Sequence, residues 1–154
     1  MAKRGGIKPI IVVAAGVILL GFFSKTGSAS SDRSVIIKDT KLNVALAVSS
    51  EEQEKGLSGR SSLGEDEGML FAYSKPEVPT FWMKGMQFPI DIIWIKDGKV
   101  VGFEEKVQDP GDYYLENSLP RYRPDSEVDR VLEVKSGWIK EHGVKKGDEV
   151  EYNF

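Results

Sequence analysis

The sequence predicts an α+β domain, mainly antiparallel β-sheet with two short helices, preceded by an N-terminal hydrophobic segment. Three observations support this fold class. Residues 90–95 are apolar at every position except Asp91, as in a strand covered on both faces in a barrel or a packed sheet. Asp97-Gly98 is the preferred dipeptide of a two-residue hairpin turn, and an apolar stretch after it returns the chain. Residues 42–48 alternate between large and small or polar side chains, which is typical of a strand.

The other elements follow from local signals in chain order. Ser49 and Glu52 have the spacing of a capping box, which predicts a short helix over residues 51–57. Ser136 is expected to cap a second helix over residues 137–142. Strands are expected at residues 34–37, 42–48, 68–73, 80–83, 90–95, 100–107, 128–134 and 149–152.

The N-terminus has the pattern of an export signal. Lys3 and Arg4 precede an apolar run over residues 9–23 that contains no charge, and a small polar stretch follows. We therefore divide the chain into a signal or anchor segment (residues 1–23), a polar linker (residues 24–33) and a folded domain (residues 34–154).

Two fates of this segment are compatible with the sequence. Gly27-Ser28-Ala29 offers a small-residue cleavage site, and cleavage near Ala29 would release a secreted or periplasmic protein. Without cleavage, residues 7–23 would hold a single-pass protein in the cell membrane with its basic end in the cytoplasm. In both cases the C-terminal domain is expected outside the cytoplasm.

Composition and charge exclude several classes of function. Four of the 21 basic residues lie in residues 1–31, so the remainder carries 17 basic and 24 acidic residues, a net charge of −7. An acidic domain argues against nucleic acid as a partner, because phosphate binding needs a basic face. The chain has no cysteine and one histidine, which excludes disulfides, thiolate zinc sites, cysteine nucleophiles and multi-histidine metal sites. No cofactor or metal is expected.

Asp91 is the charged residue that is least compatible with a solvent-exposed position, because it lies within the apolar stretch 90–95. An unpaired buried carboxylate is very costly, so Asp91 should have a cationic partner, either Lys84 or Arg60. One interpretation is an ion pair that fixes the register of two strands. The other is a binding site whose charges hold a polar ligand. Trp82 would then be part of the core or of a cleft wall, or a stacking platform if it is exposed.

Residues 108–127 form a second candidate region. They have no usable period, and a long ordered loop in a compact domain is often functional. Tyrosine and arginine are enriched at binding surfaces. The candidate ligand-binding residues of this segment are Tyr113, Tyr114, Arg121 and Tyr122.

Several motifs occur in a fixed order along the chain: Gly56-Leu57 with Arg60, Gly68-Met69-Leu70-Phe71, Phe81-Trp82-Met83-Lys84, Pro89-Ile90-Asp91, Val131-Leu132-Glu133-Val134, Gly137-Trp138 and Gly143-Val144-Lys145-Lys146-Gly147-Asp148. Together they resemble the DUF192 family of small bacterial and archaeal domains, whose biochemical function is not established. The resemblance covers about residues 42–152. It implies a compact, β-barrel-like antiparallel fold with short helices, often behind an export signal.

The chain departs from the family pattern at two places. Gly85 stands where the family usually has Asn, and residues 108–127 lack the cysteine pair that many members carry there. Any stapling or redox role of such a pair is therefore lost in this chain.

Two hypotheses of function follow. The first is a membrane-tethered, extracytoplasmic binding or scaffolding domain with an envelope polymer or an exported protein as its partner, because no nucleophile or metal constellation is visible. The second is a hydrolase or lyase acting on an envelope polysaccharide, with Asp91 or another carboxylate as acid or base and Arg60 or Lys84 holding an anionic group. No catalytic residue is assigned, and whether the protein is an enzyme stays open at this stage.

Overall fold

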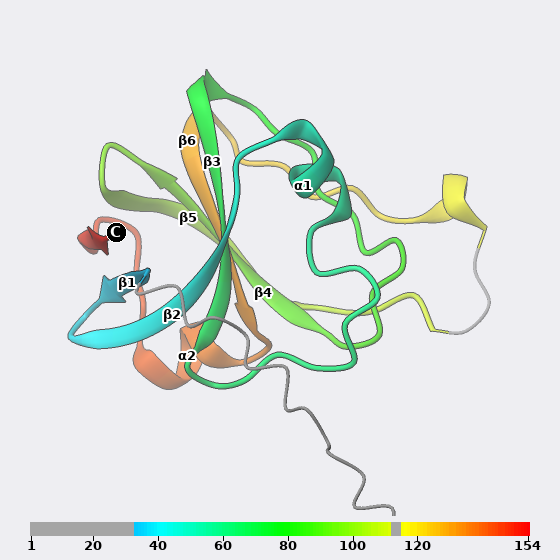
Figure 1. Ribbon diagram of the computed structural model, residues 1–154, viewed down its shortest axis with the longest axis horizontal. Helices are drawn as coiled ribbons and strands as arrows, with labels where there is room; N and C mark the ends of the chain where they lie inside the picture. Colours follow the sequence, from blue (N-terminus) through cyan, green and yellow to red (C-terminus); the bar gives the residue numbers. More distant parts are fainter. Residues whose placement is uncertain (1–32, 112–114) are drawn as a thin grey trace, which may run out of the picture.

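The structure, a computed structural model, describes residues 33–111 and 115–154 (Figure 1). Within these ranges the elements run in the following order: β1 (Ser34–Ile37), β2 (Thr40–Ala47), α1 (Ser50–Lys55), β3 (Glu67–Glu77), β4 (Ile90–Lys96), β5 (Lys99–Val107), the 3-10 helix η1 (Glu116–Ser118), β6 (Val128–Lys135), α2 (Trp138–His142) and β7 (Val150–Asn153).

The strands form one curled sheet in the order β5-β4-β6-β3-β2-β1-β7. All neighbours are antiparallel except β2 and β3, which are parallel because α1 and the loop after it carry the chain back to the start of the sheet. At one end the two edge strands meet, since the N–H of Val150 donates to the carbonyl of Gly98 at 2.8 Å. The predicted fold class, a mainly antiparallel barrel-like domain with two short helices, is confirmed.

Two apolar clusters lie on opposite faces of this sheet. The inner cluster contains Leu70, Ile93 and Leu132, and Trp138 of α2 packs into it. The outer cluster is built on the alternate positions of the same three central strands, and the connections after β2 and β3 cover it. Its members from these strands and connections include Met69, Phe71, Ile92, Val131, Leu57, Phe81 and Met83. Strands β3, β4 and β6 are therefore buried on both faces, which explains why residues 90–95 carry no apolar–polar alternation.

Two local predictions are confirmed atom by atom. The Ser49 hydroxyl accepts a hydrogen bond from the N–H of Glu52 at 3.3 Å, and the Glu52 carboxylate accepts one from the N–H of Ser49 at 2.9 Å. This capping box starts α1 one residue earlier than expected. Asp97 and Gly98 both have positive φ angles, 50° and 69°, as the tight turn between β4 and β5 requires.

Two local predictions are wrong. Residues 80–83 do not form a strand: Phe81 makes a single isolated bridge to Tyr122, and its ring packs onto the outer cluster. Ser136 does not cap α2, because the N-cap position is Gly137 with a φ of 91° and no side-chain cap of its own. The missing cap is supplied by Asp91 from β4.

None of the helices in the described part of the chain has the length and apolar character needed to cross a membrane. The predicted signal or anchor segment, residues 1–23, lies outside the described residues.

Candidate functional site

Asp91 is completely buried and its two carboxylate oxygens are satisfied by backbone groups. Oδ1 accepts hydrogen bonds from the N–H groups of Lys106 (2.8 Å) and Gly137 (3.1 Å). Oδ2 accepts from the N–H groups of Gly137 and Ile139, both at 3.0 Å. Asp91 thus caps the first turn of α2 and ties this helix to β4 and β5.

The expected ion pair of Asp91 with Lys84 or Arg60 is therefore wrong. Asp91 faces α2 on the inner side of the sheet, and backbone N–H groups take the place of the cation. Lys84 is exposed and forms an ion pair with Glu116 (Nζ to Oε1, 2.9 Å), while Arg60 is exposed in the loop after α1. The structure brings neither cation to Asp91.

Arg121 and Tyr122 of the segment 108–127 instead lie against Trp82 and Phe81. The guanidinium carbon of Arg121 lies 4.1 Å from the centroid of the Trp82 ring, and Nζ of Lys84 lies 5.1 Å from it. Tyr122 exchanges two backbone hydrogen bonds with Phe81 (2.9 and 3.0 Å). Trp82 is half-buried, and the side chains of Lys84 and Arg121 lie over its ring. It therefore forms part of a cleft wall and is not an uncovered stacking platform. Tyr113 and Tyr114 lie outside the described residues.

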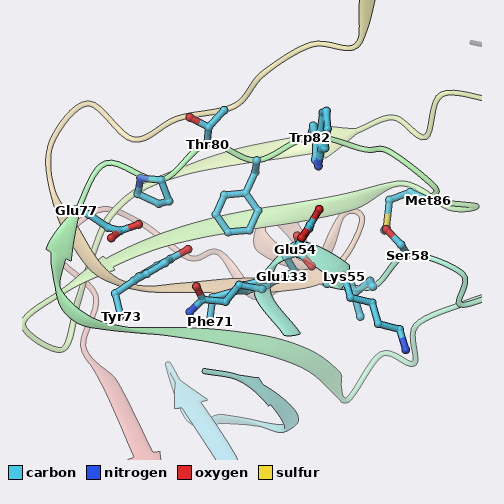
Figure 2. Close-up of a pocket in the computed structure, with 15 residues that line it drawn as sticks. Glu54, Lys55, Ser58, Phe71, Tyr73, Glu77, Thr80, Trp82, Met86 and Glu133 are labelled. Carbon is cyan, nitrogen blue, oxygen red and sulfur yellow. The ribbon is translucent and has the colours of Figure 1, made fainter. Parts of the chain in front are cut away.

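A pocket of about 320 Å³ opens on the outer side of the sheet (Figure 2). Four parts of the chain line it: α1 with the turn after it, strand β3, the connection between β3 and β4, and Glu133 of strand β6. Charged, polar and aromatic side chains of its lining include Glu54, Lys55, Ser58, Phe71, Tyr73, Glu77, Phe81, Trp82 and Glu133. The rim is braced, because the Ser58 hydroxyl donates to the carbonyl of Lys84 at 2.7 Å and the N–H of Gly59 donates to the carbonyl of Gly85 at 3.1 Å.

Glu133 is the unusual member of this lining. It lies on the central strand β6 between Met69 of β3 and Ile92 of β4, and alternation places it on the outer face with Val131. Its side chain is only 6% exposed, and Oε2 has no hydrogen-bond partner among the described residues. Burial raises the pKa of Glu133 to about 8, because the surrounding apolar groups disfavour its charged form.

The groups around Glu133 are aromatic or acidic. Tyr73 is half-buried on β3, and burial, followed by the charges of Glu77 and Glu133, raises the pKa of its hydroxyl well above its usual range. Figure 2 shows the Tyr73 hydroxyl and the Glu77 carboxylate at one end of the pocket, with Glu54 nearer Glu133. Lys55 is the cation in the lining, and its ammonium group points away from the pocket's centre in this view.

A second hollow of about 400 Å³ adjoins the first. The two share Glu54, Lys55, Ser58 and Trp82, and the second adds Lys84. Gly85 at its edge has a φ of 72°, a left-handed conformation that Gly and Asn tolerate best. The departure from the family's usual Asn therefore preserves the backbone shape of this rim.

The structure brings together Trp82 and Lys84 of one predicted candidate region with Arg121 and Tyr122 of the other, and it adds Glu133, which the sequence did not single out. A weaker signal was present, because Glu133 stands between the apolar residues Leu132 and Val134, although its strand also contains Asp129 and Arg130. What the sequence did not contain was the identity of the partners: backbone N–H groups reach Asp91, whereas none reaches Oε2 of Glu133.

The arrangement can hold a polar group against an apolar, aromatic surface. It can also supply a protonated carboxyl at neutral pH, with two further carboxylates in the same lining. In residues 33–111 and 115–154, no three acidic or histidine side chains are grouped as a metal site would require.

Comparisons with known proteins agree with this fold. A solved protein of unknown function from Novosphingobium aromaticivorans is 31% identical, with a TM-score of 0.68 over 77% of this chain and 83% of that one. A solved protein from Sinorhizobium meliloti, described as a proposed transcription regulator, is 28% identical, with a TM-score of 0.68 over 78% of this chain and 91% of that one. No curated protein matches the chain. The model of the family DUF192, described as an uncharacterized ACR, matches residues 33–152, and the chain therefore belongs to the DUF192 family.

Proposed function

We propose that this protein is an extracytoplasmic binding domain, tethered to the membrane through residues 7–23, that holds a cell-envelope polymer in the pocket above Glu133. The observation that carries the proposal is the Glu133 carboxyl, which is 6% exposed and has an unpartnered oxygen in a pocket with aromatic walls. Each unsatisfied buried polar atom of a native structure calls for an explanation, and among such atoms in the described residues the Glu133 oxygen belongs to a residue that lines a pocket of about 320 Å³. A ligand group that enters the pocket would supply the missing partner.

The surroundings of the pocket fit a ligand that extends beyond it. The adjoining second hollow continues the depression past Trp82 toward Lys84. Arg121, stacked on Trp82, extends this surface onto the segment 108–127. One repeat unit of a polymer would occupy the pocket, and the units beside it would lie along this surface. The acidic net charge does not favour the regulatory role named for the S. meliloti protein, because DNA binding needs a basic face.

The test is co-sedimentation of the full-length protein, in a mild detergent, with purified peptidoglycan. Thr80 is exposed at the pocket rim, so Thr80→Trp places a bulky side chain over the opening. Glu105→Trp puts the same side chain at an exposed position of β5 that does not line the pocket. We expect Thr80→Trp to abolish sedimentation and Glu105→Trp to leave it unchanged. Equal sedimentation of both variants, or no sedimentation of the wild type, would overturn the proposal.

A hydrolase is the second candidate, and the protonated state of Glu133 favours it. A carboxyl with a pKa of about 8 can act as a general acid at neutral pH, and Glu54 and Glu77 offer a second carboxylate. Asp91 cannot take this part, because it is sealed on the inner face of the sheet. Release of reducing ends from the polymer, lost in Glu133→Gln, would identify an enzyme. Sedimentation without such release identifies a binding domain.

A further inference from the structure

We infer that the group recognised in the pocket is a primary ammonium group of the polymer, held by the Glu133 carboxyl and the aromatic walls, with the exposed carboxylates of Glu54 and Glu77 adding negative charge at the rim. The inference rests on the proposed function and specifies its ligand chemistry. The ammonium could belong to an amino sugar or to the side chain of a diamino acid, which share the same positive charge and the same three donors.

The pocket lining contains more acidic than basic side chains. Three carboxyl groups, Glu54, Glu77 and Glu133, line the pocket, against a single cation, Lys55, whose ammonium group points away from the centre. No side chain in the described part of the chain donates a hydrogen bond to Oε2 of Glu133. The side chains of Lys84 and Arg121 lie over the Trp82 ring and do not contact Glu133. Lys84 also pairs with Glu116. Among the described residues Oε2 of Glu133 therefore has no donor, and a positively charged donor would suit the acidic lining.

Aromatic side chains form the walls of the pocket. Phe71, Tyr73, Phe81 and Trp82 line the same pocket as the three carboxyl groups. Aromatic faces attract cations, the ammonium group of a lysine side chain among them, through their negative quadrupole. A neutral hydroxyl would gain little from these walls and would leave the other carboxylates unneutralised. An anionic ligand would be repelled by them.

Ionisation of Glu133 links this binding to pH. Burial keeps Glu133 protonated below about pH 8, and the acidic groups that face the pocket, Glu54, Glu77 and the Tyr73 hydroxyl, do not stabilise its charge. A bound ammonium favours the ionised form, so binding releases one proton from Glu133. Affinity for a permanently charged amine should rise roughly 50-fold from pH 6 to pH 8 and level off above that.

The experiment is calorimetric titration of the full-length protein with Nα-acetyl-lysine amide, whose ε-ammonium stays charged throughout this range. The matched neutral ligand is the same compound acetylated on the ε-nitrogen. We expect the charged ligand to bind at least tenfold more tightly at pH 8, with proton release. Glu133→Gln should remove most of that preference at pH 8 and little at pH 6. Glu77→Gln, a change on the surface, should reduce it in part, and Glu105→Gln should not change it.

Binding of glucosamine and of N-acetylglucosamine is also measured at pH 7. This comparison distinguishes an amino sugar from a diamino acid as the source of the ammonium group. Tighter binding of glucosamine than of the lysine derivative assigns the ammonium to an amino sugar, and the reverse assigns it to a diamino acid. Equal binding of every charged and neutral pair would overturn the inference, while loss of sedimentation in Thr80→Trp would still uphold the proposed function. Charge-selective amine binding without any effect of Thr80→Trp on sedimentation would overturn the proposed function alone.

Discussion

Replacement of Asp91 by Ala should cost a large part of the stability of this domain. The substitution leaves the N–H groups of Lys106, Gly137 and Ile139 without their acceptor at a site that is fully buried. An unsatisfied buried donor costs roughly 1–3 kcal/mol, so three of them predict a loss of about 3–9 kcal/mol, toward the lower end because the bonds from Lys106 and Gly137 are only partly buried. Total stabilities are about 5–15 kcal/mol, so this loss would be conspicuous.

Urea denaturation of the full-length protein, followed by tryptophan fluorescence, measures this loss. Asp91→Asn keeps one acceptor oxygen but turns an NH₂ group toward backbone donors, so it should lose about half as much as Asp91→Ala. Lys84→Ala and Arg60→Ala should each cost less than about 1 kcal/mol, because both side chains are exposed. A loss in Lys84→Ala or Arg60→Ala that equals the loss in Asp91→Ala would refute the reasoning and restore the ion pair.

Three further predictions concern the central strands and the segment 108–127. The pKa of Glu133 is raised from 4.5 to about 8 on folding, so the folded state binds the extra proton and stability should fall as pH rises between these values. Glu133→Gln should remove this slope, which amounts to about 1.4 kcal/mol per pH unit at most in denaturation series. Gly68→Ala would place a Cβ 3.0 Å from the carbonyl oxygen of Glu133 and should destabilise the protein by about 1–3 kcal/mol in the same assay, whereas Gly64→Ala meets only a flexible side chain and should be tolerated. Arg121→Ala should weaken the hold of the segment on the indole ring by about 0.5–1 kcal/mol, which faster hydrogen exchange of the Tyr122 N–H would report.

Local sequence signals predicted most of the fold because they act over a few residues. The capping box of Ser49 and Glu52 and the turn at Asp97-Gly98 are determined by short-range geometry, and both are present in the structure. The prediction of a strand at residues 80–83 was wrong because their apolar side chains are buried by packing over the sheet and not by pairing within it. An apolar run signals burial, but it does not distinguish a strand from a covering segment.

The candidate site was predicted only in part because its chemistry depends on partners distant in sequence. Asp91 and Glu133 look alike in the chain, since each is a carboxylate with apolar neighbours on both sides in the sequence. They differ because Asp91 faces the N–H groups of α2, 46 or more residues away, whereas Glu133 faces a pocket. Which face of the sheet each one takes follows from register, and register is a property of the assembled sheet.

The most direct test of the central role of Glu133 is its titration by ¹³C NMR of the side-chain carboxyl in the full-length protein, with Glu133→Gln to assign the signal. We predict a midpoint near 8 for the free protein, in line with the pKa that burial imposes. Saturating Nα-acetyl-lysine amide should lower this midpoint, because a bound ammonium stabilises the carboxylate. A midpoint near 4.5, unmoved by the amine, would contradict the account, because Glu133 would then be an ordinary solvated carboxylate.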